Sequence, residues 1–232
     1  MRPDEFERVR KLAIFSGVEA AQVDAMLRVS FLQRFPLGVE LVREGEPADF
    51  LHVIVAGNVE VFSSYRDRET TVAVLGSGQC FILAAVVLDR IYLKSARSLT
   101  PAQILLIPAD AVRRCFTEDA AFARCLATDL ALAYRMVVKE LKNQKLRSGL
   151  ERLANWLLAY HAEIGGELRF ELPFEKKVLA ARLGMAPEVL SRAFAALSPY
   201  EVKVKGPLIE IRDVESLRTL ARPTPTIDDP ST

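Results

Sequence analysis

The stretch LAARLGMAPEVLSRAFAAL, residues 179–197, constrains the fold of this 232-residue chain more than any other feature. Leu179, Ala180 and Leu183 recur at helical spacing, so a first short helix has one apolar side to bury. Gly184 suits the left-handed position that ends a helix, and Pro187 suits the first turn of a second helix. The pattern favours a helix-turn-helix, and an ordinary helical hairpin is the alternative.

The second helix of this pattern separates a buried stripe from an outward face. The predicted stripe consists of Val189, Leu190, Ala193, Phe194 and Leu197. The predicted outward face consists of Glu188, Ser191, Arg192 and Ala195. Polar residues near the start of the second helix are typical of a helix that contacts base edges.

The residues after this helix predict a β-hairpin, EVKVKGPLIEIRD, and so a winged helix-turn-helix. Val202 and Val204 alternate before Gly206-Pro207, and a second apolar run follows them. Lys203 and Lys205 would face solvent together and could meet DNA phosphates, as could Lys176 before the first helix. The alternative is that these lysines are only solvated.

Charge and composition limit the classes of function. The net charge is +1, so a DNA-binding charge has to be local. Residues 171–206 hold six Lys or Arg (Lys176, Lys177, Arg182, Arg192, Lys203, Lys205) against four Glu (Glu171, Glu175, Glu188, Glu201). No Ser/His/Asp set, phosphate loop or metal cluster is present, which argues against an enzyme.

The remaining composition predicts a cytoplasmic protein that is not inserted in a membrane. The N-terminus, MRPDEFERVRK, is charged and lacks the apolar core of a signal peptide. No apolar run approaches the ~20 residues of a membrane helix. The three cysteines form no CxxC pair, so a disulfide framework or zinc site is not expected.

Short strands broken by glycines and charged turns fill residues 35–106 and predict a small all-β roll. The spacing of Gly38, Glu44-Gly45-Glu46, Leu51 and Gly57-x-Val59-x-Val61 resembles the cyclic-nucleotide-binding roll. With the winged helix after it, the chain resembles the Crp/Fnr family of bacterial transcription regulators over residues 12–220. The expected fold is therefore α+β: a cyclic-nucleotide-binding-type β-roll, a long dimerisation helix and a C-terminal winged helix-turn-helix.

The resemblance implies a homodimer formed through a long helix. Residues 117–146 contain no Gly or Pro, and an a/d seam recurs at Leu130, Tyr134, Val137, Leu141 and Gln144. A helix that lies only on its own core is the alternative. The SGLE run, residues 148–151, predicts a capping box and places a hinge at Ser148-Gly149.

These boundaries divide the chain into four predicted parts. They are a sensor domain at 1–116, the dimerisation helix at 117–147, the DNA-binding domain at 148–222 and a disordered tail at 223–232. Disorder is predicted for the tail because its run RPTPTIDDPST is rich in Pro, Thr and Asp.

The effector pocket departs from the family pattern. The family holds cyclic AMP with a glutamate, an arginine and a serine, and Leu83, Tyr92 and Leu93 align with these positions. An anionic phosphate in an apolar pocket needs such partners, so we expect that cyclic AMP is not bound. Cys80, Phe81 and their neighbours predict a more apolar cavity.

The signal itself stays open among three alternatives. The apolar cassette resembles that of the nitric-oxide-responsive denitrification regulators, which implies haem, and His52 is the candidate axial ligand. An apolar small molecule and no ligand at all are the other two. No cysteine precedes Cys80, which excludes the iron–sulfur branch of the family.

The resemblance also implies what the second helix recognises. The FNR-like branch carries a Glu-x-x-Ser-Arg pattern, which Glu188, Ser191 and Arg192 match residue by residue. Arg can hold guanine bidentately and Glu can accept from an amino group of a base. The implied operator is a TTGAT-like inverted repeat bound by a dimer that acts on RNA polymerase. A cyclic-nucleotide-binding module without DNA function is the remote alternative.

Overall fold

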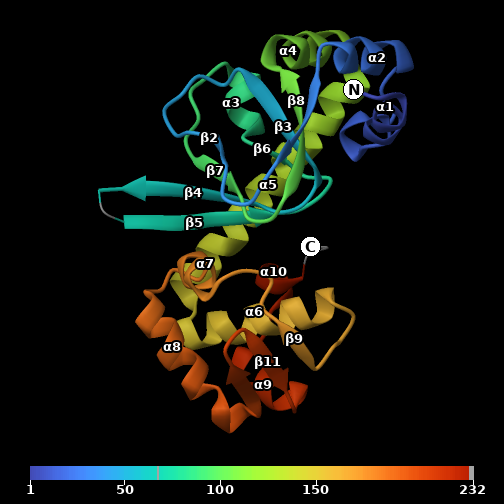
Figure 1. Cartoon of the computed structure of the whole chain (residues 1–232). Helices are drawn as coiled ribbons and strands as arrows, with labels where there is room; N and C mark the ends of the chain where they lie inside the picture. Colours follow the sequence, from blue (N-terminus) through green and yellow to red (C-terminus); the bar gives the residue numbers. More distant parts are fainter. Residues whose placement is uncertain (67, 230–232) are drawn as a thin grey trace. The chain divides into compact units, whose positions relative to one another are not determined.

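The computed structural model describes residues 1–66 and 68–229 (Figure 1). The chain divides into two compact units, Met1–Ala133 and Tyr134–Thr232. Their boundary lies within the long helix α5 (Ala120–Leu146), so this one helix contributes residues to both units. Among the described residues, no helix combines the length and apolar character needed to cross a membrane.

The N-terminal unit is a β-roll of two antiparallel four-stranded sheets flanked by helices (Figure 1). The strand orders are β1-β8-β3-β6 and β2-β7-β4-β5. The strands are β1 (Phe31–Phe35), β2 (Glu40–Val42), β3 (Phe50–Ala56), β4 (Val59–Tyr65), β5 (Arg68–Leu75), β6 (Cys80–Phe81), β7 (Ser95–Ser98) and β8 (Ala102–Pro108). The helices are α1 (Pro3–Arg10), η1 (Ala13–Phe15), α2 (Ala20–Arg28), α3 (Leu83–Leu88) and α4 (Ala109–Glu118).

The core of this unit is built from continuous buried runs in β3 and β8 and from the start of α5. Leu51 and Ile54 of β3 and Ile104 of β8 are fully buried, and Phe122 and Leu126 of α5 join the same cluster. The turn after β3 requires glycine, because Gly57 has φ +86° and a Cβ there would lie 2.5 Å from the Pro101 carbonyl oxygen. The predicted roll is therefore confirmed.

The helix after β8 is broken at Asp119, which the sequence did not indicate. The Asp119 carboxylate accepts hydrogen bonds from the Phe122 and Ala121 amides at 2.8 Å and from the Glu19 amide at 3.2 Å. The Phe122 and Glu19 amides, together with that of Ala121, hold the pKa of this carboxyl below its usual range. This cap starts α5 at Ala120, while Thr117 belongs to α4. The prediction of one helix from residue 117 is wrong for its first three residues.

The C-terminal unit is the predicted winged helix-turn-helix. Its elements are α6 (Gly149–Glu163), β9 (Arg169–Glu171), α7 (Lys176–Arg182), α8 (Pro187–Ala196), η2 (Ser198–Tyr200), β10 (Val202–Lys205), β11 (Leu208–Ile211), α9 (Val214–Ala221) and α10 (Pro225–Asp228). The strand order is β10-β11-β9. Trp156 of α6 stacks on Tyr160 at 5.3 Å and lies 5.9 Å from the ring of Phe174. The α+β fold class is confirmed.

The start of α6 and the C-terminal tail each test a sequence prediction. The capping box is confirmed, because the Glu151 amide donates to the Ser148 hydroxyl and the Ser148 amide donates to the Glu151 carboxylate. The prediction of a disordered tail is wrong for residues 223–229, because α10 forms there and Asp228 pairs with Arg147. The rest of the predicted tail, residues 230–232, lies outside the described residues.

Candidate DNA interface and effector region

The turn between α7 and α8 has the geometry that the sequence predicted. Gly184 adopts φ +64°, and Pro187 occupies the first turn of α8. A Cβ at Gly184 would lie 2.6 Å from Oε1 of Gln144 on α5, so space as well as backbone conformation requires glycine. This contact ties the last turns of α5 to the helix-turn-helix.

The outward face of α8 carries the predicted recognition residues. Glu188, Ser191 and Arg192 are exposed, and none of their side chains forms a hydrogen bond or ion pair with another of the described residues. Leu190, Ala193 and Phe194 are buried beneath them. Val189, which was predicted in the buried stripe, is 39% exposed and lies beside this face instead.

A groove of about 510 Å³ runs between α8 and the wing strand β10. Ser191 and Phe194 line it from α8, Lys203 lines it from β10, and Lys176 lines it from the start of α7. The Lys176 ammonium lies 5.1 Å from the centre of the Phe194 ring, a cation–π contact that holds its charge at the groove. Lys205 is exposed on the same strand, outside the groove lining. Two cations beside an exposed polar helix face are suited to a phosphate backbone.

The predicted dimer seam on α5 is exposed in its middle and engaged at its ends. Tyr134, Val137 and Leu141 are 70%, 60% and 53% exposed. Leu130 packs against the N-terminal core, and Gln144 lies against Gly184 and donates to Glu140 at 2.7 Å. Exposed apolar side chains that lie together on one face of a helix are a feature of interaction surfaces.

The predicted effector residues do not all line one interior. Phe81, Leu83 and Tyr92 are buried, and the Tyr92 hydroxyl donates to the Phe50 carbonyl at 3.2 Å. Leu93 is 73% exposed, so the prediction that it faces an apolar cavity is wrong. The chain between α3 and β7 is irregular there, and strand alternation does not extend to Leu93.

Cys80 is held by the long helix. Its thiol donates to the Asp129 carboxylate of α5 at 3.0 Å, and burial together with this carboxylate raises the pKa of the Cys80 thiol. A raised pKa keeps the sulfur protonated, which opposes metal ligation and redox reactivity. The hydrogen bond from Cys80 to Asp129 joins β6 to α5.

The cations near the family's phosphate position are Arg97 and Lys94. Arg97 forms ion pairs of 2.7 Å with Glu60 and with Glu69, and its guanidinium lies over the Phe62 ring at 4.3 Å. Lys94 is half-buried, and desolvation lowers the pKa of its ammonium. Arg97 is thus paired with two carboxylates. Sequence patterns do not reveal this pairing because the partners are far apart in the chain.

His52 is a core residue in this structure. It is 4% exposed, its ring lies 5.0 Å from the Phe81 ring, and Nδ1 is 3.2 Å from the Phe50 carbonyl oxygen. Burial lowers the pKa of His52 to about 4. These packed surroundings do not fit an axial haem ligand, because a porphyrin needs an open face beside the imidazole. No metal-binding group of three or more His, Cys, Asp or Glu occurs in the described parts of the chain.

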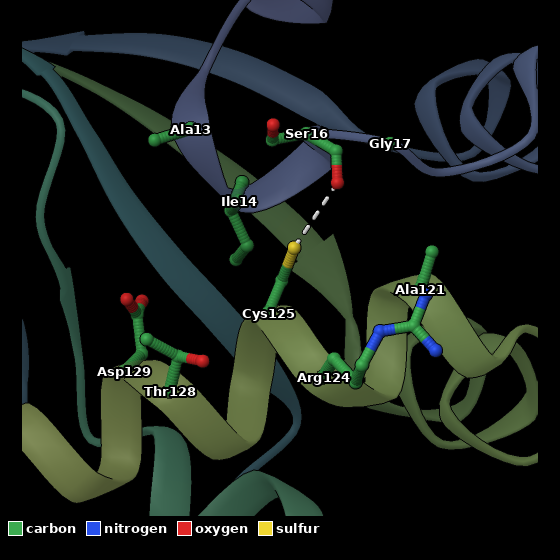
Figure 2. A pocket seen from close by; sticks show the side chains of 9 residues that line it. All are labelled: Ala13, Ile14, Ser16, Gly17, Ala121, Arg124, Cys125, Thr128 and Asp129. Atoms are coloured by element: carbon green, nitrogen blue, oxygen red, sulfur yellow. Dashed lines mark hydrogen bonds between the residues drawn. The ribbon is translucent and has the colours of Figure 1, made fainter.

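A separate cavity of about 320 Å³ lies between the η1 turn and the first half of α5 (Figure 2). Cys125 of α5 faces the turn, and its thiol donates to the Ser16 carbonyl at 3.2 Å (Figure 2). Arg124, Thr128 and Asp129 line the helix side of the cavity. None of the predicted effector residues lines this cavity.

Two protein families match this chain, one in each half of the sequence. Residues 32–119 match the cyclic nucleotide-binding domain family, and residues 151–220 match the Crp-like helix-turn-helix domain family. The CRP-like cAMP-activated global transcriptional regulator of Mycobacterium tuberculosis is 25% identical over 222 residues, which cover 93% of this chain and 99% of that protein.

Two solved structures extend the comparison to the fold. A proposed cAMP-binding regulatory protein from Silicibacter pomeroyi is 28% identical with a TM-score of 0.60, covering 94% of this chain and 100% of that one. FixK2 from Bradyrhizobium japonicum is 21% identical with a TM-score of 0.73, covering 84% of this chain and 99% of that one.

Proposed function

Because this chain belongs to the Crp/Fnr family of transcription regulators, we propose that it reads a TTGAT-like inverted repeat as a homodimer through α8. The observation that carries this proposal is the exposed set Glu188, Ser191 and Arg192 beside a groove with two cations. Arg192 is assigned to a guanine edge, Glu188 to an amino group of a base, and Ser191 to a base edge or phosphate.

The dimer is proposed to form through the exposed apolar residues of α5. Tyr134, Val137 and Leu141 would pair with the same residues of a second chain in a parallel contact. Two recognition helices then enter successive major grooves, about 34–36 Å apart. As a regulator of this class, the dimer would act in the cytoplasm on RNA polymerase bound nearby.

The test separates base reading from phosphate contact. Fluorescence anisotropy is measured with a duplex that carries the inverted repeat and with duplexes changed at one base pair. Arg192→Ala is expected to cost ~1–3 kcal/mol on the intact repeat and to relax specificity at one position. Lys203→Ala is the matched control, expected to weaken all duplexes equally and to lower the salt slope by about 1. Equal weakening of all duplexes by Arg192→Ala would contradict the base-reading role.

For the signal, we propose an effector other than cyclic AMP. Leu83 stands where the ribose partner is expected, and Tyr92 and Leu93 stand where the phosphate partners are expected. Arg97 is paired with two glutamates. Apolar side chains favour an uncharged ligand over a phosphate. The cAMP named for two relatives belongs to those proteins, and calorimetry with cyclic AMP tests this chain directly. Stoichiometric micromolar binding would overturn the proposal.

Haem-based nitric oxide sensing, the other predicted signal, finds no support at His52, which is packed against Phe81. Titration of the apoprotein with haemin, followed by nitric oxide under nitrogen, tests it. A saturating one-to-one Soret band that shifts with the gas would revive this signal. Loose, non-saturating uptake would leave an apolar metabolite or a ligand-independent regulator.

A further inference from the structure

The C-terminal segment of the chain, residues 224–229, binds the last turns of α5. Asp228 of α10 accepts two hydrogen bonds from the Arg147 guanidinium, at 2.7 Å and 2.5 Å. The Arg147 side chain is only 8% exposed and that of Asp228 is 22% exposed. A bidentate pair in such a sheltered position is stronger and more directional than an open surface ion pair.

Two further contacts fasten the same segment to α5. The Lys142 ammonium donates to the Thr226 hydroxyl at 2.8 Å and to the Thr226 carbonyl at 3.2 Å. The Lys139 ammonium donates to the Asp229 carbonyl at 2.5 Å. Asp228 also accepts from the Thr224 amide at 2.6 Å, which closes the single turn of α10 on itself. We call residues 224–229 the C-terminal strap.

Arg147 occupies the connection between two helices. The helix α5 ends at Leu146 and α6 begins at Gly149, so Arg147 and Ser148 form the link. The Arg147 carbonyl accepts from Nη1 of Arg152 at 2.8 Å, and Nε of Arg152 donates to the Leu183 carbonyl at 2.9 Å. The strap is therefore joined through Arg147 and Arg152 to the end of α7, just before the turn of the helix-turn-helix.

The strap leaves the predicted dimer seam free. With about 100° per residue, Lys139 and Lys142 point about 160° and 140° away from Val137 on the helix surface. Val137 and Leu141 stay exposed while the strap is in place. The strap therefore does not cover the exposed seam residues Val137 and Leu141.

We propose that the C-terminal strap fixes the direction in which α6 leaves α5, and that it thereby sets the affinity of the helix-turn-helix for its operator. Besides the strap contacts, the described residues hold the link through the bond from Arg152 to the Arg147 carbonyl and through the contact of Gln144 with Gly184. Release of the strap frees the link, and a free link has to be ordered again when the two winged helices dock on DNA. The operator part of this proposal rests on the proposed function.

The first experiment measures, without DNA, how strongly the strap orders the link between α5 and α6. Hydrogen exchange of the amides of residues 147–152 is compared in the full-length chain, in Asp228→Ala and in a chain that ends at Pro223. Both variants are expected to exchange about tenfold faster at these amides, because a sheltered charged pair is lost. Glu215→Ala is the matched control, since it removes an exposed carboxylate paired with Arg218 on α9. Unchanged exchange in the two strap variants would overturn the proposal.

The second experiment measures operator affinity of the same proteins. The strap variants are expected to bind the operator at least about threefold more weakly than the full-length chain, with the control unchanged. Faster exchange with unchanged affinity would refute the claim that the strap sets affinity. If circular dichroism shows that the shortened chain does not fold, the full-length variants Asp228→Asn and Thr226→Ala replace it in both experiments. If the full-length chain binds no operator, the proposed function has failed. The hydrogen-exchange experiment still tests whether the strap orders the link between α5 and α6.

Discussion

His52 allows the burial of the β-roll core to be tested by pH. Its imidazole is 4% exposed, and burial lowers the pKa of His52 from 6.5 to about 4. Between these two values the unfolded chain binds a proton at this residue that the folded chain does not bind. The free energy of unfolding therefore rises with pH across this window, and the stabilisation present above 6.5 is lost as pH falls toward 4.

The size of the effect follows from the two pKa values. One pKa unit corresponds to about 1.4 kcal/mol, so the linkage predicts a loss of about 2 kcal/mol between pH ~7 and pH ~5 from this residue alone. The carboxylates of the chain contribute their own pH dependence, and comparison with a variant that lacks only the His52 imidazole subtracts that contribution. In His52→Leu the apolar side chain fills a similar volume and does not titrate.

Urea unfolding followed by far-UV circular dichroism measures both proteins at the two pH values. The fall in unfolding free energy of the wild type should exceed that of His52→Leu by about 2 kcal/mol. Histidine ring signals provide an independent check, because the chain has two histidines and the variant identifies which signals belong to His52. Equal pH slopes in the two proteins would refute the reasoning that His52 is a neutral core residue.

Three other perturbations follow from the structure. Ser148→Ala should cost about 1 kcal/mol, since it removes the acceptor of the α6 cap, and denaturation followed by Trp156 fluorescence measures it. Gly57→Ala should cost roughly 1–3 kcal/mol by thermal unfolding, because its Cβ would press on a carbonyl oxygen; full stability would contradict the close approach. Leu141→Lys should shift sedimentation toward the monomer, whereas Arg135→Ala, away from the seam, should not; equal dimerisation of both would rule out the seam.

Much of the fold could be predicted because local signals agree with tertiary structure. Gly184 and Pro187 mark the turn with their own backbone preferences, and Ser148 with Glu151 forms a cap that involves only neighbouring residues. The outward face of α8 followed from helical periodicity. Val189 departs from it because the stripe of a short helix is narrower than a simple count of apolar residues implies.

What could not be predicted depends on partners distant in sequence or on irregular backbone. The strap has the composition of a disordered tail, and its order comes from Arg147, 81 positions before Asp228. Arg97 has its glutamates on other strands. Leu93 lies where the chain leaves a regular strand, and Ile82 adopts φ +64°, a conformation that a β-branched residue rarely takes.

The stacked aromatic group around α6 gives the C-terminal unit an optical signal of its own. Trp156 is the chain's single tryptophan, and it lies against Tyr160 and Phe174 within the winged helix-turn-helix unit. Indole fluorescence therefore reports on this half alone, whereas circular dichroism records both halves. Two coincident melting curves would mean that the β-roll and the winged helix-turn-helix unit unfold in one cooperative transition. A tryptophan transition that precedes the dichroism transition would mean that the winged helix-turn-helix unit unfolds while the β-roll remains folded.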